Sequence, residues 1–493
     1  MVGDVVGPEP DGSTLWRVDR ESLLTDLAAL IERDPCNISL RFHYANVLAE
    51  LGRTDEAIAA YWDLLTRDPS HRGSLNNLGV LLYSANRWQA ARTCFAEAVS
   101  IYPEDPVGHL NLGNVLRESG DLHAALEQYV KCLALDADNR QAHRGLAMVF
   151  DELGDETKAW FHRDAGFKGA AIQFLPYYGR GPGVPLLVLS TAGRGNTPLG
   201  PLLNTQIFRT SVAVVEYVEQ AHSLSPYQLI VNGISDADGS QDALMTAEDL
   251  LRGMALPVIN RPDQVGRTGR AAVARILAGI PGVITPRISP IARDEITRNK
   301  TQAIVEKYRL DFPLLLRTPG FHTGRHFLRI DDESRLKEGA LSLPGEYLLA
   351  IQYLDTRETD GYFRKYRVMM IDGILYPYHL ALSRHWKVHY FTSDMASRSD
   401  HRKEEARFLD DMAGSLGERV MNILHRISTL LNLDYAGIDF GINAKGDLVL
   451  FEANATMVVN PPETGEKWDY KRQAFAQISS AFERMLINRA GEA

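Results

Sequence analysis

Three oxygen-bearing side chains near the carboxyl end of the chain have the types and spacing of a divalent-metal site: Asp439, Glu452 and Asn454. Two apolar runs, AGIDFGI and LVLFEA, flank the turn-forming residues 444–447, and this pattern predicts a β-hairpin. Glu452 and Asn454 are two residues apart, so they project from one face of a strand, and Asp439 can face them from the partner strand. Burying these groups without a cation would cost several kcal/mol. Hard oxygen ligands without Cys or His suit Mg²⁺.

The hairpin pattern by itself also fits a surface hairpin whose polar face is in water. The segment, however, resembles the metal-binding strands of the ATP-grasp superfamily, in which an Asp is followed by a Glu-x-Asn pair at the end of a hairpin. D-alanine–D-alanine ligases and bacterial glutathione synthetases are members. The resemblance implies an α+β ATP-grasp domain over residues 291–490, in which Asp439, Glu452 and Asn454 hold Mg²⁺.

The same resemblance assigns residues to the phosphates of ATP. Two cationic residues hold them in the family: Lys300 matches the first, and Arg317 stands where the second is normally a Lys. A guanidinium keeps the charge but is a planar fork rather than a point charge. The loop from Gly320 to Gly324 would bring backbone N–H groups to phosphate oxygens.

The stretch YLLAIQYL, residues 347–354, looks like the strand that leads to the adenine hinge. Backbone groups of its last three residues would read the base, and one of two acids that follow would take the ribose hydroxyls. These residues are Gln352, Tyr353, Leu354, Asp355 and Glu358. The stretch KYRVMMIDG resembles glutathione synthetases, and the match implies that Arg367 holds the transferred phosphate or the acyl-phosphate. The family often has Asp two residues before this Arg, where this chain has Lys365.

The segment SRHWKVHYFTSDM, residues 383–395, has no counterpart in the family that we can assign. It gathers basic and aromatic side chains, among them Arg384, Trp386 and Lys387. Two interpretations stay open: a loop that binds an anionic or planar acceptor substrate, and a solvated strand with amphipathic aromatic residues.

Patterns of strands and helices alternate along residues 185–290. VPLLVLS, YQLIVNG, LPVIN and GVITPRI read as strands, with helical patterns between them, and they predict a parallel α/β layer over residues 185–290. Its order resembles the small α/β domain that precedes the grasp region in the family (the preATP-grasp domain), where it helps to bind substrate. A Gly- and Pro-rich linker is expected at 171–184.

The first third of the chain repeats with a step of 34 residues, seen at Ala57, Ala91, Ala125 and Ala159. This is the period of the tetratricopeptide repeat. We expect an all-α solenoid over residues 19–170, with four repeats at 38–71, 72–105, 106–139 and 140–170, a capping helix at 19–33 and a disordered lead-in at 1–18. Such an array offers a groove for a protein or peptide. Alternatively, it only dimerises the protein or braces the catalytic domain.

Composition excludes several classes of function. The net charge is −10 and the pI about 5.8, so no nucleic-acid partner is expected. No run of about 18 apolar residues or signal-peptide pattern occurs, which predicts a cytoplasmic protein without a membrane contact. The three cysteines have no metal-ligand spacing.

The resemblance thus implies a multidomain ATP- and Mg²⁺-dependent ligase that joins a carboxylate to an amine through an acyl-phosphate and forms ADP. The repeat array would present a peptide or protein substrate or bind a partner. Two alternatives from other classes are a tetratricopeptide scaffold whose grasp domain binds nucleotide without turnover, and a small-molecule phosphotransferase.

Overall fold

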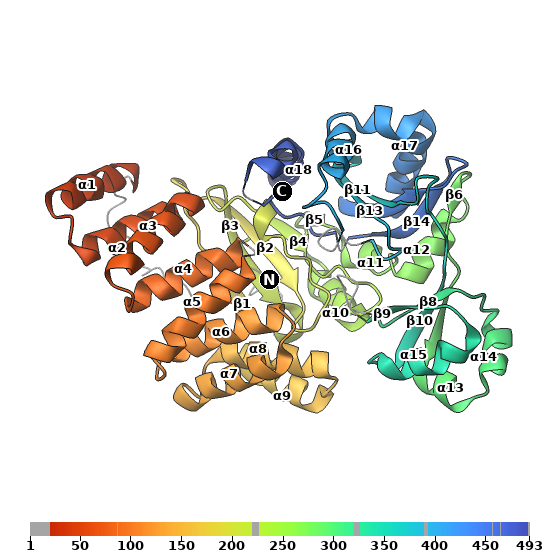
Figure 1. The fold of residues 1–493 in the computed structure, drawn as a ribbon, viewed down its shortest axis with the longest axis horizontal. Helices are drawn as coiled ribbons and strands as arrows, with labels where there is room; N and C mark the ends of the chain where they lie inside the picture. The colour runs from red at the N-terminus through yellow and green to blue at the C-terminus, as the bar shows by residue number, and fades with distance from the viewer. Residues whose placement is uncertain are drawn as a thin grey trace. The chain divides into compact units, whose positions relative to one another are not determined.

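The computed structural model describes residues 20–85, 87–218, 226–319, 326–388, 393–455, 457–463 and 465–491. It separates into two compact units, Met1–Ala170 and Ala171–Ala493 (Figure 1). The glycines Gly320 and Gly324, expected to cover phosphates, lie outside the described residues.

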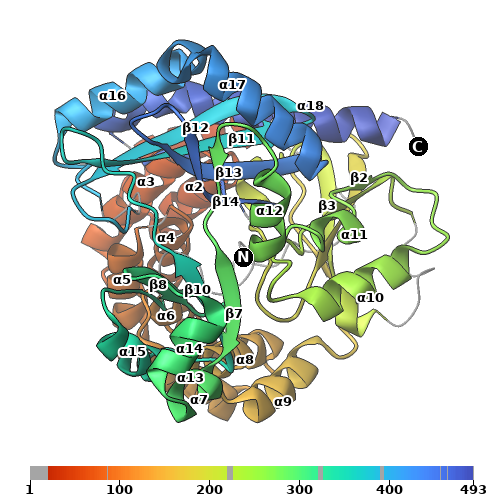
Figure 2. The same ribbon diagram turned by 90° about the vertical axis from the view of Figure 1, so that its right-hand side faces the viewer.

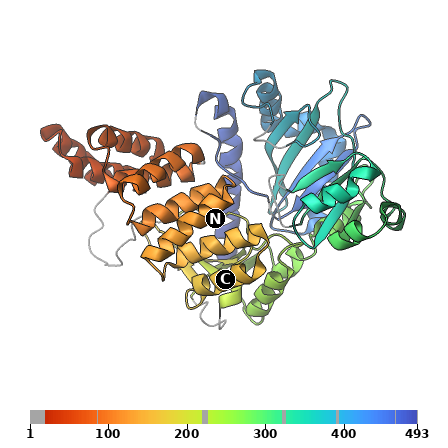
Figure 3. The same cartoon turned by 60° about the horizontal axis from the view of Figure 1, so that its bottom comes forward.

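The described part of the first unit is helical (Figure 3). Its helices are α1 (Arg20–Arg33), α2 (Ile38–Glu50), α3 (Thr54–Arg67), α4 (Arg72–Ser84), α5 (Trp88–Ile101), α6 (Pro106–Glu118), α7 (Leu122–Leu135), α8 (Arg140–Leu153) and α9 (Glu156–Phe167). Each 34-residue repeat expected from the sequence contains one helix pair, and α1 precedes the first pair. The predicted repeat solenoid is therefore confirmed.

The spacing of small and aromatic residues explains why these helices pack in pairs. The alanines at the 34-residue step are fully buried, at 0% exposure. A Cβ added at Gly79 would lie 2.5 Å from the ring of Phe95, and one at Gly113 would lie 2.8 Å from the ring of Tyr129. The glycines thus give room for the aromatic side chain of the next helix. In the last repeat Arg163 replaces the aromatic residue and forms an ion pair with Asp151.

The second unit begins with a five-stranded sheet in the order β1-β3-β2-β4-β5. Its strands are β1 (Ile172–Phe174), β2 (Val184–Ser190), β3 (Phe208–Val214), β4 (Leu229–Asn232) and β5 (Val258–Ile259). All neighbours are parallel except β1, which pairs antiparallel with β3. The helices between its strands and after them are α10 (Gln241–Leu251), α11 (Pro262–Val265) and α12 (Arg270–Leu277). The predicted parallel α/β layer is thus present in the structure.

Two details of this layer differ from the prediction. The expected linker at 171–184 carries β1, whose register pairs Ile172 with Ala213, so this segment is part of the sheet. The strand expected in GVITPRI is β6 (Val283–Ile284), and it pairs with β14 of another sheet. Both differences arise because strand pairing is decided by distant segments, which local composition does not report.

A four-stranded antiparallel sheet follows, in the order β7-β10-β8-β9. Its strands are β7 (Ile288–Ala292), β8 (Leu314–Arg317), β9 (Phe327–Ile330) and β10 (Tyr347–Gln352), and its helices are α13 (Arg293–Arg298), α14 (Thr301–Tyr308) and α15 (Leu336–Ser342). Strands β8 and β9 lie on either side of the expected phosphate loop. The predicted strand–loop–strand order is therefore confirmed for the two strands.

The last sheet has the order β12-β11-β13-β14-β6 (Figure 2). Its long strands are β11 (Phe363–Ile371), β12 (Ile374–Ser383), β13 (Tyr435–Ile442) and β14 (Leu448–Asn454); the helices are α16 (Ser399–Asp410), α17 (Met412–Leu431) and α18 (Arg472–Gly491). Short 3₁₀ helices elsewhere in this unit cover Gly200–Leu202, Val215–Tyr217, Glu333–Arg335 and Glu466–Lys471. The predicted hairpin is β13 and β14, joined at a turn in which Gly446 has a φ of 75°.

Buried polar contacts fix the first sheet of this unit against the last. Asn260, directly after β5, donates its side-chain N–H to the carbonyl of Tyr435 at 2.6 Å. Its backbone N–H donates to Asp434 at 2.8 Å. Thr197, after β2, donates to the carbonyl of Ala455 at 3.1 Å. The carboxyl ends of β2 and β5 are therefore held beside β13 and β14, which carry the predicted metal ligands.

In the parts of the chain that the structure describes, no helix is both long enough and apolar enough to cross a bilayer.

Candidate functional site

A row of charged side chains runs across three strands of the last sheet. In the strand register, Arg367 on β11 lies opposite Asp439 on β13, and Asp439 lies opposite Glu452 on β14. Residues directly opposite one another project from the same face of a sheet. Asn454 follows two residues later, and its amide donates to Glu452 at 3.3 Å. The structure therefore brings together Arg367 and the three predicted metal ligands.

Asp439 is held by two cations from β11. Arg367 donates Nε to Oδ1 at 2.5 Å and Nη2 to Oδ2 at 2.8 Å, and Lys365 donates Nζ to Oδ2 at 3.0 Å. Burial raises the pKa of Asp439, but the charges of Arg367 and Lys365 outweigh it and hold this pKa well below its usual range. Lys365, which departs from the family pattern, thus acts here as a partner of Asp439.

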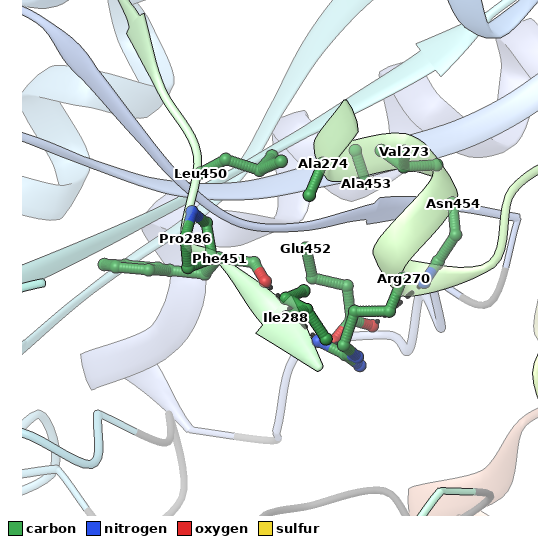
Figure 4. Close-up of a pocket in the computed structure, with 10 residues that line it drawn as sticks. All are labelled: Arg270, Val273, Ala274, Pro286, Ile288, Leu450, Phe451, Glu452, Ala453 and Asn454. Carbon is green, nitrogen blue, oxygen red and sulfur yellow. Dashed lines mark hydrogen bonds and ion pairs between the residues drawn. The ribbon is translucent and has the colours of Figure 1, made fainter. Parts of the chain in front are cut away.

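Glu452 is held by a cation that the sequence did not single out. Arg270, the first residue of α12, donates to Glu452 at 2.6 Å (Figure 4). Its backbone N–H donates to Asp238 at 2.9 Å. Burial raises the pKa of Glu452, yet Arg270 and Arg317 lower it to about 2. Glu452 is therefore fixed as a carboxylate.

A small pocket of about 260 Å³, open solvent included, lies beside this ion pair (Figure 4). Its lining comes from α12, from β7 and the chain before it, and from β14: Arg270, Val273, Ala274, Pro286, Ile288, Leu450, Phe451, Glu452, Ala453 and Asn454. The labelled side chains of Glu452, Arg270 and Asn454 lie on one side of it. Glu452 and Asn454 thus line a pocket that is partly open to solvent.

The residues of the row fit Mg²⁺ in donor type, because two ionised carboxylates lie directly opposite one another and Asn454 adds an amide oxygen. In this structure Asp439 accepts from Arg367 and Lys365, and Glu452 accepts from Arg270 and Asn454. Among the residues that the structure describes, no group of three or more His, Cys, Asp and Glu side chains is arranged for a metal. A cation held here would take its protein ligands from the two carboxylates and the amide oxygen.

The two cations predicted for the phosphates differ in position. Arg317, at the end of β8, lies close enough to Arg270 and Glu452 for their charges to act on it, and burial together with the charge of Arg270 lowers its pKa to about 10. The four-stranded sheet therefore places Arg317 within electrostatic reach of Glu452. Lys300 is exposed and immediately precedes α14, and no hydrogen bond or ion pair within the described ranges joins it to the row. Its role stays a prediction.

One backbone N–H of the predicted adenine hinge is already paired within the sheet. The backbone N–H of Gln352 donates to the carbonyl of Arg287 at 2.8 Å, so this N–H cannot also read a base. Strand β10 pairs with β7 as well as with β8, and the N–H of Gln352 bonds to the chain on the β7 side. Tyr353 and Leu354 follow the end of β10, and the ring of Tyr353 lies 4.5 Å from the Arg329 guanidinium.

Both acids proposed for the ribose already have basic partners. Asp355 is exposed and pairs with Arg357 at 2.8 Å, whereas Glu358 is half-buried and pairs with Arg364 at 3.2 Å. Burial raises the pKa of Glu358. Each of the two acids is thus held by a guanidinium.

Comparison with known proteins identifies the repeats. The tetratricopeptide repeat model matches residues 26–106 and 110–160. The chain is 32% identical over 115 residues to the "Probable UDP-N-acetylglucosamine--peptide N-acetylglucosaminyltransferase SPINDLY" of Hordeum vulgare, covering 23% of this chain and 12% of that protein. The protein of the same name from Arabidopsis thaliana is 31% identical over 110 residues, again with 12% of its length covered. The chain thus spans about an eighth of these relatives.

Among solved structures, MamA from Desulfovibrio magneticus RS-1 (residues 41 to the end) matches with 20% identity and a TM-score of 0.29, covering 30% of this chain and 82% of that chain. Another MamA crystal structure matches with 17% identity and a TM-score of 0.29, covering 30% and 86%. The match to the repeat model, together with the helix pairs of the first unit, shows an N-terminal tetratricopeptide solenoid, which is followed by a mixed α/β region with several sheets.

The importance of Arg270 can be tested against a neighbouring arginine. Arg270 and Glu452 are 15% and 18% exposed, so Arg270→Met leaves a largely buried carboxylate without its ion-pair partner and should destabilise β14 by about 3–5 kcal/mol. Arg267, on the same segment, forms an ion pair in which its side chain is 74% exposed, and Arg267→Met should cost less than about 1 kcal/mol. Native-state hydrogen exchange of β13 and β14 measures both. Equal protection in the two variants would show that Arg270 does not support Glu452.

Proposed function

We propose that the α/β region is an ATP- and Mg²⁺-dependent ligase that joins a carboxylate to an amine through an acyl-phosphate and releases ADP. The observation that carries this proposal is the row Arg367–Asp439–Glu452 across β11, β13 and β14, with Arg317 within electrostatic reach from the neighbouring sheet. The carboxylates of Asp439 and Glu452 are surrounded by cations from β11, α12 and β8. This arrangement suits a cation bound together with several phosphate oxygens.

The reaction places distinct demands on these residues. An oxygen of the acid attacks the γ-phosphorus of ATP, the bond to the β-phosphate oxygen breaks, and ADP leaves. The amine then attacks the acyl carbon, loses a proton, and phosphate departs with the oxygen that came from the acid. Mg²⁺ held by Asp439, Glu452 and Asn454 would supply charge neutralisation at the β- and γ-phosphates.

The chain's own cations supply the remaining charge. Arg317, a planar fork at the end of β8, would bind phosphate oxygens in two-point fashion. Arg367 binds Asp439 with two N–H groups, which fixes its plane beside the metal ligand, where it would bind the transferred phosphate. Donors held in place before the reaction stabilise developing charge without a cost of reorganisation.

The solenoid suggests a macromolecular substrate or partner. Arrays of this kind hold an extended peptide or a helix in their groove. We infer that the array presents a peptide or protein that carries the acid or the amine, or binds a partner enzyme. The relatives named as glycosyltransferases match over about a fifth of this chain, so their activity gives no argument for a glycosyltransferase here.

A substrate screen tests the proposed activity. The whole chain is incubated with Mg²⁺ and ATP against pairs of amino acids and peptides, and ADP release is followed together with the masses of the products. ADP and phosphate in step with a new amide support the ligase. AMP with pyrophosphate would mean adenylation, a stable phosphorylated product would mean a phosphotransferase, and bound ATP without turnover for every pair would mean a scaffold.

A further inference from the structure

The segment that follows β12 crosses from the last sheet to the four-stranded sheet. Arg384 stays beside its own sheet, with its guanidinium 5.0 Å from the ring of Tyr362. Trp386, two residues later, packs edge-to-face on Phe327 of β9 at 5.4 Å and on Tyr353 after β10 at 6.4 Å. Trp386 therefore packs on the sheet that carries Arg317, because its two ring contacts are with Phe327 of β9 and with the residue directly after β10.

Lys387 lies beside Arg317. Its Nζ donates to the carbonyl of Phe327 at 3.3 Å and lies 5.9 Å from the centre of the Phe327 ring. The Arg317 guanidinium lies 5.5 Å from the centre of the same ring, and Arg317 faces Phe327 in the β8–β9 register. Two cations thus share one aromatic side chain, and the ammonium group, which has three donors, uses one of them on the carbonyl.

The electrostatics of this pair favour an anion. Desolvation and the charge of Arg317 both lower the pKa of Lys387. Like charges held at close range raise the free energy of the site, and a bound anion would recover that energy. Lys387 is nevertheless exposed, so an anion can reach it from solvent.

Aromatic side chains lie next to this cationic pair. Tyr353 directly follows the strand expected to lead to the adenine hinge, and its ring lies at 84° to that of Trp386 and 4.5 Å from the Arg329 guanidinium. Aromatic side chains of this kind bind the flat face of a base. The cationic group of Lys387 and the aromatic ring of Trp386 are neighbours, because the two residues are consecutive in the chain. A nucleoside triphosphate carries both an anion and a flat base in one molecule.

We propose that Lys387 is a second phosphate-binding cation, placed beside Arg317 by the chain after β12, and that Trp386 and Tyr353 bound the space for the base. The inference rests on the proposed function in that the ligand is ATP. It assigns the basic and aromatic segment to the nucleotide rather than to the acceptor substrate. It also supplies a point charge where the family has Lys and this chain has Arg317.

Nucleotide binding to the whole chain tests this inference without any acid or amine. Affinities for Mg²⁺-ATP and, by competition, for adenosine are measured for the wild type, Lys387→Ala, Lys387→Arg and Lys445→Ala. Lys445 is an exposed lysine in the β13–β14 turn, so its variant removes the same charge elsewhere. Lys387→Ala should raise the Kd for ATP roughly ten- to hundredfold and leave the Kd for adenosine within about twofold. Lys387→Arg should recover most of the affinity for ATP, and Lys445→Ala should match the wild type.

Two results with Lys387→Ala overturn the inference. An unchanged Kd for ATP in Lys387→Ala would mean that the ammonium contacts no phosphate. Equal weakening of ATP and adenosine would mean that Lys387 only anchors the chain to Phe327. The proposed function fails separately: a wild type that binds ATP but forms no amide leaves the inference standing, whereas a wild type that binds no ATP overturns both.

Discussion

Glu452→Gln should abolish ATP turnover while the chain remains folded. The change removes one of the two carboxylates that face each other across β13 and β14, and with it a charge needed to hold a cation against the phosphates. Loss of one group that stabilises transition-state charge typically lowers kcat by roughly 10²- to 10³-fold. Glutamine keeps the length of the side chain, and its carbonyl can still accept the hydrogen bond from Arg270, but Arg270 loses its charged partner, so the stability of the variant is measured together with its turnover.

A carboxylate on the same hairpin provides the matched control. Asp447 lies in the turn between β13 and β14 and pairs with Arg419 at 2.5 Å, where the arginine is 59% exposed. Asp447→Asn removes the same charge from the same hairpin, away from the row, and should retain turnover. ADP release with the acid and amine found by the screen measures both variants, and thermal unfolding checks the fold. Normal turnover in folded Glu452→Gln, or equal loss in both variants, would rule out the metal assignment.

A fragment of residues 171–493 should bind ATP as the whole chain does and turn over a macromolecular substrate far more slowly. Tethering a bound substrate raises its effective concentration, so loss of the array should lower kcat/KM for that substrate by roughly 10²-fold. The fragment must begin at Ala171 rather than near residue 183, because β1 pairs with β3 and its removal would leave that edge exposed.

A small analogue of the substrate that carries only the reacting group is the control for this fragment. It should react equally with the fragment and the whole chain, since it gains nothing from the array. Steady-state kinetics with the two substrates separate the contributions. If the fragment converts the macromolecular substrate as fast as the whole chain, the repeats serve dimerisation or bracing instead.

Local periodicity was enough to predict the solenoid and the hairpin. The 34-residue step in Ala57, Ala91, Ala125 and Ala159 reports a packing need that each repeat meets with its neighbours, and all four are fully buried. Alternation within β14 predicted that Glu452 and Asn454 share a face, because side-chain direction within a strand has a fixed period of 2. In both cases the information lies within a few tens of residues. The register shift between Asp439 and Phe440, which brings Asp439 opposite Glu452, could not be predicted from this period.

Contacts between distant segments were not predictable in the same way. Arg270 is the first residue of a helix whose sequence has no distinguishing pattern. It is 182 residues from Glu452 in sequence, and only the fold brings the two side chains into contact. Backbone groups of Gln352 were expected to read the base, and its N–H already donates to the carbonyl of Arg287, which directly precedes β7. A composition cue existed for Trp386 and Lys387, since basic and aromatic residues gather there, yet their partners Phe327 and Tyr353 come from other strands.

Transfer of an oxygen atom from the acid to phosphate tests the central claim most directly. The acid is prepared with ¹⁸O in its carboxyl group and incubated with the amine, ATP and Mg²⁺, and mass spectrometry follows both the amide and the released phosphate. An acyl-phosphate route requires ¹⁸O in the phosphate in step with amide formation, because the activated oxygen leaves with phosphorus. Amide formed alongside unlabelled phosphate would contradict the proposed route.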